Sequence, residues 1–415
     1  MSLALDPQPA EPPAPPPAPP APPAATALTL ISVAGLAMGL CGGLCGLLYF
    51  GLATLSLVGS AEALGLAVAV GATTLLLLGL GATISRGAAA AMRGLPGTPF
   101  GPARAPVWLG LLALVLTAGT ALLYLGSRPL TLLVFTPLHM AAAILPALAA
   151  VAYTAGRSGR PDWLSWRGVL GRLAWGACGA TFLAMLAELA AGLLLVVLSA
   201  VVLGSSESGR SSLDALNQLV EQAGASGGLD PSALDPAQLA PLLHPVVVLA
   251  AFLLLALIGP TIEELCKLAG LMLRPPRNRA QAWAWGVAVG AGFGIFESVF
   301  FSAFELSALV WPSTALLRGL STLMHASMTG LAALGWLALR VERRPLTGLA
   351  GIVLAIVGHG LWNGLALGSL LFGLLGQPAL QAGSAGGVVV LFYAIFFGFL
   401  FAPGRLRRRG APAVS

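Results

Sequence analysis

Charged side chains are scarce in this 415-residue chain: only 9% of its residues are Asp, Glu, Lys or Arg, whereas 57% are hydrophobic. Soluble globular domains carry about 25% charged residues, so the composition excludes an ordinary soluble domain and indicates a membrane protein. Cysteine is also rare, which excludes a disulfide framework and a soluble zinc finger. The four cysteines all fall inside apolar stretches, at Cys41, Cys45, Cys178 and Cys266.

Several hydrolase motifs are missing as well. The chain has no HExxH sequence, no aspartate falls in a segment long enough to span a membrane, and no GxSxG or related buried serine pattern accompanies a histidine. These absences exclude the common zinc-helix, aspartyl-dyad and serine-nucleophile arrangements inside a membrane.

Long hydrophobic runs dominate what is present. A helix needs about 20 apolar residues to cross a bilayer, and ten segments meet this requirement. We therefore predict an all-α polytopic membrane protein with about ten transmembrane helices. The spans lie at approximately 28–58, 63–85, 106–126, 130–155, 173–203, 245–273, 282–304, 314–339, 346–376 and 386–403.

Basic residues are distributed unequally between the two ends of these spans. If all ten spans are real, 17 of the 21 Lys and Arg residues lie on one side of the membrane. The positive-inside rule places that side, with both termini, in the cytosol of a bacterial-type cytoplasmic membrane. The net charge of +6 then reflects orientation, and no nucleic-acid partner is expected. The 17 residues are Arg86, Arg93, Arg104, Arg157, Arg160, Arg167, Arg172, Arg274, Arg277, Arg279, Arg340, Arg343, Arg344, Arg405, Arg407, Arg408 and Arg409.

Composition also divides the chain into regions. Residues 1–25 form a Pro/Ala tract, which we expect to be a disordered cytosolic tail, and residues 404–415 form a basic cytosolic tail. Between them we expect an amino-terminal four-helix membrane region at 26–172 and a catalytic core at 173–403. The core includes an outer loop at 204–244, whose stretch LDALNQLVEQ is expected to form a surface helix; the alternative is a lid over a substrate entrance.

Four successive predicted spans carry polar side chains at helical spacing. Residues four apart share one helix face, so each helix presents its pair in one direction. At about 1.5 Å per residue, the pairs fall in the central layer of a hydrocarbon core about 30 Å thick. Charges at that depth cost about 2.5–3.5 kcal/mol each and usually mark functional sites. The pairs are Glu263 and Glu264 with Lys267, Phe293 with Glu297, His325 with Thr329, and His359 with Asn363.

Each residue alone has an ordinary explanation. Lys267 can simply neutralise Glu263, Phe293 can be a packing residue, and Asn363 can link two helices. The whole set at one depth favours a site that activates water. Gly259-Pro260, just upstream, is expected to break the ladder of helical hydrogen bonds. This break is expected to place both glutamates in the first turn of a new segment and to open polar backbone to the cavity.

Two mechanisms are open for such a set. A buried carboxylate can act as a general base, with histidine and asparagine donors stabilising an oxyanion. Alternatively, Glu264, Glu297, His325 and His359 can hold Zn²⁺, whose bound water attacks a peptide carbonyl. The excess of carboxylates over histidines slightly favours the glutamate-activated water, so the cofactor is either none or Zn²⁺.

The four pairs resemble the motifs of the PrsW family of intramembrane proteases, relatives of the CAAX-processing and bacteriocin-processing membrane proteases. Those motifs are E-E-x-x-K, F-x-x-x-E, a histidine helix, and H-x-x-x-N or D, and they match residues 263–363 here in order. The resemblance implies an intramembrane endopeptidase that cleaves a membrane-protein substrate, as in site-1 cleavage of an anti-sigma factor. It implies catalytic roles for Glu263, Glu264, Glu297, His325, His359 and Asn363, with Lys267, Phe293 and Thr329 in support.

A proton- or ion-coupled transporter is the alternative function, because buried glutamate and histidine also mark ion pathways. His139 and Glu188 lie in predicted spans outside the motifs and support this reading. We expect them instead to form a structural pair that holds the amino-terminal helices to the core. No internal repeat of the kind typical of transporters is evident.

Overall fold

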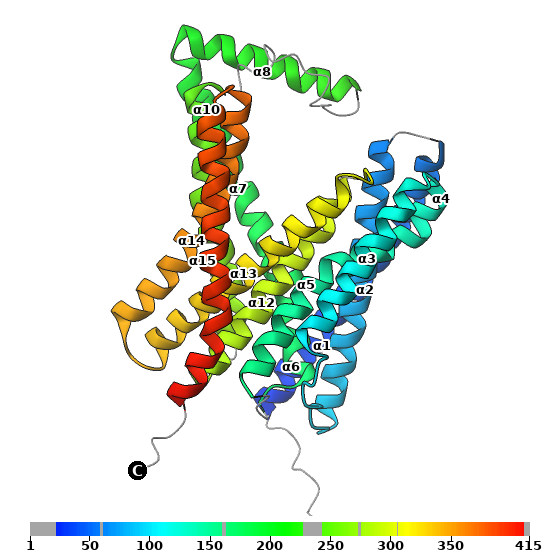
Figure 1. Ribbon diagram of the computed structural model, residues 1–415, viewed down its shortest axis with the longest axis vertical. Coiled ribbons are helices and arrows are strands. Elements are labelled where there is room, and N and C mark those ends of the chain that lie inside the picture. Colours follow the sequence, from blue (N-terminus) through cyan, green and yellow to red (C-terminus); the bar gives the residue numbers. More distant parts are fainter. Residues whose placement is uncertain are drawn as a thin grey trace, which may run out of the picture.

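The computed structural model describes residues 22–58, 61–159, 163–226, 243–272, 275–304 and 306–410, and ten helices in these ranges are long and apolar enough to cross a membrane (Figure 1). The predicted fold class, an all-α polytopic membrane protein, is therefore confirmed. The elements are α1 (Pro22–Val58), α2 (Ala61–Met92), α3 (Ala105–Tyr124), α4 (Arg128–Leu130), η1 (Thr131–Phe135), α5 (Thr136–Arg157), α6 (Trp166–Ala174), η2 (Trp175–Ala180), α7 (Thr181–Gly204), α8 (Glu207–Ser226), α10 (Pro245–Phe252), η4 (Leu253–Ile258), α11 (Gly259–Met272), α12 (Arg279–Phe301), η5 (Ser302–Phe304), α13 (Trp311–Arg340), α14 (Pro345–Leu374) and α15 (Pro378–Gly410).

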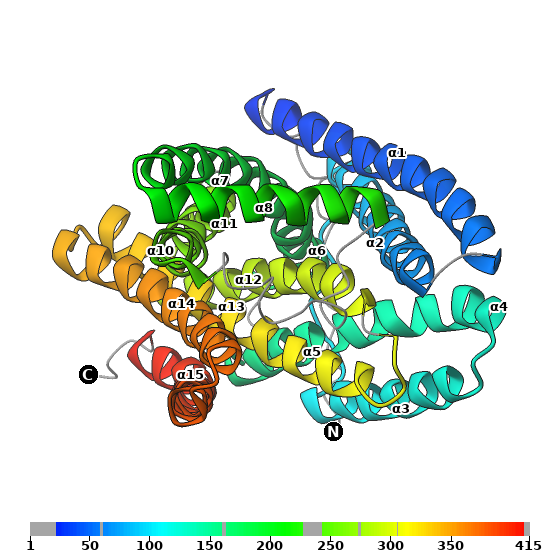
Figure 2. The same ribbon diagram turned by 90° about the horizontal axis from the view of Figure 1, so that it is seen from above.

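Helices α12 and α13 form the centre of the bundle, and the other long helices surround them (Figure 2). In the apolar stretch of α12, 78% of the residues are buried inside the protein, and in that of α13 72% are buried. In α14 the share is only 17%. Small residues allow α12 and α13 to pack closely. A methyl group on Gly290 would collide with the carbonyl oxygen of His325, and one on Gly294 would lie 2.7 Å from the Cα of Thr322. This close approach brings Phe293 and Glu297 beside His325.

Proline shapes two of the helices through π-helical turns. Segment η1 precedes Pro137, and the amide of Thr136 bonds to the carbonyl of Thr131, five residues back. In this register the carbonyl of Leu132 would pair with the amide of Pro137, but proline has no N–H. The hydroxyl of Tyr49, in α1, donates to Leu132 O at 2.8 Å instead. The freed carbonyl thus ties α1 to the core.

The predicted break at Gly259-Pro260 is present in the hydrogen-bond ladder, because Pro260 has no N–H to donate, but it does not interrupt the helix. The chain stays helical, with Gly259 in the right-handed α conformation, and a π-helical turn at Leu253–Ile258 carries it into α11. A π-turn shifts the hydrogen-bond register, which lets the helix continue past a proline that cannot donate. Because α11 begins at Gly259, Glu263 and Glu264 lie one turn inside it.

The amino-terminal helices pack directly on the core, and His139 is one of the links. Its Nε2 lies 2.9 Å from the carbonyl oxygen of Val299 in α12, and the indole of Trp311 in α13 donates to its Nδ1 at 3.1 Å. The predicted pairing of His139 with Glu188 is wrong, because both ring nitrogens of His139 are taken by α12 and α13. His139 nevertheless has the predicted structural role.

Both ends of the described chain lie on one side of the molecule. In Figure 1 the start of α1 and the end of α15 are at the bottom, and α8 crosses the top, roughly perpendicular to α7. The predicted surface helix is therefore present as α8, whereas the rest of the outer loop, at 227–242, lies outside the described residues. The predicted tail at 1–25 also lies almost entirely outside them, with α1 beginning at Pro22, and α15 continues into the predicted tail at 404–415 as far as Gly410.

Candidate active site

Lys267 is the hub of the polar cluster. Its ammonium nitrogen lies 2.9 Å from Oε2 of Glu263, 2.9 Å from Oε1 of Glu264 and 3.0 Å from Nδ1 of His325. The side chain is completely buried, so its charge is balanced only by the two carboxylates that it contacts. An ammonium has three N–H donors, and these three acceptors match that number.

Phe293 completes the environment of Lys267. The ammonium lies 3.9 Å from the centroid of the Phe293 ring, and the His325 ring centroid is 5.2 Å from the same ring. A cation over an aromatic face is stabilised by the ring quadrupole. Phe293 therefore lines the site and packs against both the cation and a histidine.

His325 is held between two helices. Its Nε2 lies 2.9 Å from Oε2 of Glu297 in α12, and its Nδ1 faces Lys267 and Glu263 in α11. An ammonium can only donate, so Nδ1 is the acceptor and Nε2 carries the proton that Glu297 accepts. This tautomer follows from the hydrogen-bond network. Glu297 thus fixes both the orientation and the protonation of the His325 ring.

His359 has a similar arrangement on the opposite side. Its Nδ1 lies 3.1 Å from Oε1 of Glu264, and its Nε2 lies 3.7 Å from Oε2 of Glu263. Oε2 of Glu264 accepts a hydrogen bond of 3.0 Å from the hydroxyl of Thr329. Glu264 is completely buried. Its contact with Nδ1 of His359 fixes the orientation of that ring.

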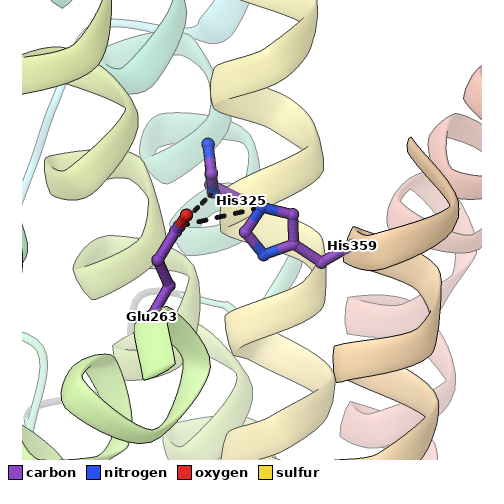
Figure 3. Close-up of side chains that lie close together, drawn as sticks. All are labelled: Glu263, His325 and His359. Carbon is purple, nitrogen blue, oxygen red and sulfur yellow. Dashed lines mark ion pairs between the residues drawn. The ribbon is translucent and has the colours of Figure 1, made fainter. Parts of the chain in front are cut away.

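Glu263, His325 and His359 converge at the centre of the cluster (Figure 3). Their ligand-type atoms all lie within 4.8 Å of one another, and this is the one such group among the described residues. Both histidines direct their unprotonated nitrogen toward the same oxygen, Oε2 of Glu263, at 3.9 Å from His325 and 3.7 Å from His359. The sequence suggested Glu264 and Glu297 as ligands, but the structure places those two carboxylates on the outer nitrogens of the histidines.

This donor set fits a divalent metal such as Zn²⁺. Ligands at about 2.0–2.2 Å from a tetrahedral zinc lie roughly 3.3–3.6 Å apart, so small side-chain movements would bring the three atoms to that spacing. Ligating histidines usually donate their other N–H to a carboxylate or carbonyl, and Glu297 and Glu264 are in that position. The chemical types, the directions of the nitrogens and the outer partners all agree.

Asn363 faces away from the carboxylates. Its amide donates to the carbonyl oxygen of Leu255 at 3.0 Å. In η4 the amide of Gly259 bonds to Leu254 O, so the next bond in this register would need an N–H from Pro260, which has none. Asn363 supplies the missing donor, as Tyr49 does for Leu132. It fastens α14, which carries His359, to the helix that carries Glu263.

Arg318 belongs to the cluster but was not identified from the sequence. Its guanidinium lies 3.7 Å from Oε2 of Glu297 and 4.8 Å from the centroid of the Phe301 ring. The side chain is about 31% exposed, so it links the buried site to the surface of the bundle. Arg318 precedes His325 by seven residues, which places both side chains on the same helix face two turns apart. This spacing could have identified Arg318 as a neighbour of the site.

Comparison with known proteins gives one match. Residues 237–400 match the family model described as PrsW family intramembrane metalloprotease. The matched segment contains every residue of the cluster, and the match confirms the resemblance that the four motifs predicted. The amino-terminal helices lie outside it. Comparisons with curated proteins and with solved structures gave no significant match.

Proposed function

We propose that this protein is a metal-dependent intramembrane endopeptidase that cleaves membrane-anchored protein substrates. The match of residues 237–400 to the family model supports a protease, and the ten candidate spans among the described residues support a location in a lipid bilayer. The proposed metal ligands are Glu263, His325 and His359, and Glu264 and Glu297 orient the two histidines.

One observation carries the choice of a metal. Because Glu297 and Glu264 accept the N–H of the outer ring nitrogens, the hydrogen-bond network leaves the inner nitrogens of His325 and His359 as acceptors. Both inner nitrogens lie near Oε2 of Glu263. A neutral histidine in this tautomer cannot donate a hydrogen bond to an oxyanion from that nitrogen, but it can bind a cation. A metal ion there would polarise a carbonyl oxygen and activate water.

The residues of the chain provide the rest of the site. Glu297 and Glu264 hold the histidine rings, because each accepts the N–H of one ring. Lys267 balances the negative charge of Glu263 and Glu264, which lowers the cost of burying two carboxylates. The eight buried or half-buried polar groups of the cluster thus form one network, in which the loss of any member leaves a partner unsatisfied. They are Glu263, Glu264, Lys267, Glu297, Arg318, His325, Thr329 and His359.

The proposed substrate is a protein with a transmembrane segment, because the cluster is buried in the middle of the predicted spans. An anti-sigma factor, as the family resemblance implies, is one substrate of this kind. The proposed location is a bacterial-type cytoplasmic membrane with both termini in the cytosol.

The test uses purified protein in lipid nanodiscs and a single-span test substrate. We expect about one bound Zn²⁺ per chain, cleavage that stops with a chelator, and recovery on adding Zn²⁺. Glu263→Gln and Glu264→Gln should each lower the rate by at least the 10²–10⁴-fold typical of a lost acid–base group, while Glu342→Gln, outside the site, should remain active. Full activity in the Glu263→Gln, Glu264→Gln double variant would end the protease proposal. Chelator-resistant cleavage by metal-free protein would favour the glutamate-activated water.

A further inference from the structure

Glu188 is a half-buried acidic group that the proposed mechanism does not use. It lies in α7, and its Oε1 atom is buried without a hydrogen-bond partner among the described residues. Its neighbours on the helix face outward, with Met185 at 55% and Leu189 at 61% exposure. An unpaired carboxyl group on a helix that faces lipid is costly. A bound molecule that donates a hydrogen bond to it would remove this cost.

A shallow, open cavity of about 440 Å³ lies beside this carboxyl group, and all of its lining residues belong to the outward face of α7. Glu188 is the one acidic residue in its lining, which is otherwise apolar. Such a lining, with a single polar group, is typical of a site that binds an apolar segment and orients it by one hydrogen bond. The other lining residues are Phe182, Met185, Leu186 and Leu189.

The cavity is next to the proposed active site. The Oε1 atom of Glu188 lies 3.6 Å from the position that a Cβ on Gly259 would occupy, and Gly259 is the first residue of α11. Glu263 follows one turn later on the same helix. An extended segment lying against Glu188 would therefore be within a few residues of the cluster.

We propose that this cavity binds an unwound stretch of a substrate's transmembrane segment and that Glu188 accepts a hydrogen bond from its backbone. The inference rests on the proposed function. A peptide bond in an intact helix has its N–H bonded internally, and unwinding it in lipid frees N–H groups that need an acceptor. Glu188 supplies that acceptor, and because the last torsion of a glutamate is broad, either oxygen can turn toward the donor. Substrates with helix-breaking residues in mid-membrane are the class favoured by this site.

The experiment measures binding separately from cleavage. A photo-crosslinking amino acid replaces Met185 in the Glu263→Gln protein, and Leu114, which is 65% exposed on α3, serves as the matched control position. Two single-span test proteins with identical flanks are compared, one with Gly-Pro in mid-membrane and one with an uninterrupted polyleucine segment. We expect crosslinking from position 185 to the Gly-Pro protein, several-fold weaker crosslinking to the polyleucine protein, and background only from position 114.

Variants at Glu188 then test the carboxylate. Glu188→Leu should lower the crosslinking yield up to roughly tenfold at subsaturating test protein, as expected for the loss of one hydrogen bond. Glu188→Gln keeps a carbonyl acceptor and should retain most of the yield. In protein with native Glu263, Glu188→Leu should raise KM and leave kcat nearly unchanged. The thermal stability of Glu188→Leu should equal or exceed that of the wild type, because the variant removes an unpaired carboxyl group.

The outcomes separate this inference from the proposed function. Unchanged crosslinking and KM in Glu188→Leu, or equal crosslinking from position 114, would overturn the binding site even if the wild type cleaves. Selective, Glu188-dependent crosslinking without any cleavage by the wild type would support the binding site and overturn the protease proposal. Absence of both crosslinking and cleavage would overturn both.

Discussion

The ammonium nitrogen of Lys267 lies 3.0 Å from Nδ1 of His325, the ring nitrogen that also faces Glu263. Lys267 therefore makes contacts that a metal ion at the centre of the cluster would make. Two cations cannot share these ligands at close range without strong repulsion in a medium of low dielectric constant. The lysine side chain must withdraw from His325 when a metal binds.

The variant Lys267→Met tests this competition. Without metal it should be destabilised by about 3–5 kcal/mol, because Glu263 and Glu264 lose their buried counter-charge. Added Zn²⁺ should stabilise the variant more than the wild type, since the competing cation is gone. Thermal unfolding with and without Zn²⁺ measures both effects. The rate of cleavage should fall less than in Glu263→Gln. If Zn²⁺ raises the unfolding temperature of the variant and of the wild type by the same amount, the competition is contradicted.

Glu297→Gln tests the outer support of His325. The amide of glutamine can rotate its oxygen toward Nε2, so the ring should stay in place, but the negative charge that strengthens the ligand is lost. Loss of an outer carboxylate usually lowers metal affinity about 10–100-fold, and we expect an effect in this range by competition with a chromogenic chelator. Glu342→Gln is the control, and it should bind metal like the wild type. An unchanged metal affinity in Glu297→Gln would show that Glu297 does not support His325 as a metal ligand.

Asn363 is expected to act through structure. Asn363→Ala leaves the carbonyl of Leu255 without a donor, and in hydrocarbon, where no water can replace the donor, an unsatisfied group costs about 1–3 kcal/mol. Asn363→Asp should be at least as destabilising, because it places an acceptor against an acceptor. Denaturation in detergent micelles measures the loss, and Tyr49→Phe, which frees Leu132 O in the same way, is the matched comparison. Wild-type stability with lost cleavage in Asn363→Ala would instead assign the side chain to catalysis.

Much of the fold and of the site follows from the sequence. The ten spans are visible because hydrocarbon imposes a minimum apolar length on a helix. The convergence of Glu263, Glu297, His325 and His359 is predictable because helical spacing fixes each face and the rise per residue fixes each depth. Four polar pairs at one depth have few arrangements that keep them away from lipid.

The assignment of individual roles depends on features that spacing does not encode. Glu263 and Glu264 are adjacent, about 100° apart around the helix, so the rotation of α11 decides which one meets both histidines. That rotation depends on the π-helical turn at Leu253–Ile258, which a hydrophobic pattern does not reveal. The same turn frees Leu255 O and draws Asn363 away from the carboxylates. His139 and Glu188 were paired because both are polar, whereas the structure separates them by giving His139 two other partners.

The ion pair between Arg279 and Glu342 predicts a pH dependence outside the membrane-spanning part. The guanidinium of Arg279 donates two hydrogen bonds to Glu342, of 2.7 and 2.6 Å, and this bonding lowers the pKa of Glu342. A lowered pKa gives stability that is present above the ordinary glutamate value of about 4.3 and lost as the pH falls through the lowered value. Because the pair is partly exposed, the effect should stay below about 1 kcal/mol. The stability difference between wild type and Glu342→Gln at pH 7 should therefore shrink near pH 3, and a constant difference would contradict the assignment.

The orientation of the protein in the membrane can be tested with cysteine labelling. All four native cysteines are replaced, and single cysteines are introduced at Ser211 in α8 and at Arg93 after α2, both exposed positions. The 17 one-sided basic residues and the positive-inside rule place Arg93 in the cytosol and α8 outside. A membrane-impermeant maleimide should then label Ser211→Cys in intact cells and Arg93→Cys only after permeabilisation. The reverse pattern would invert the topology, and labelling of both positions from outside would mean that the number of crossings between them is even rather than odd.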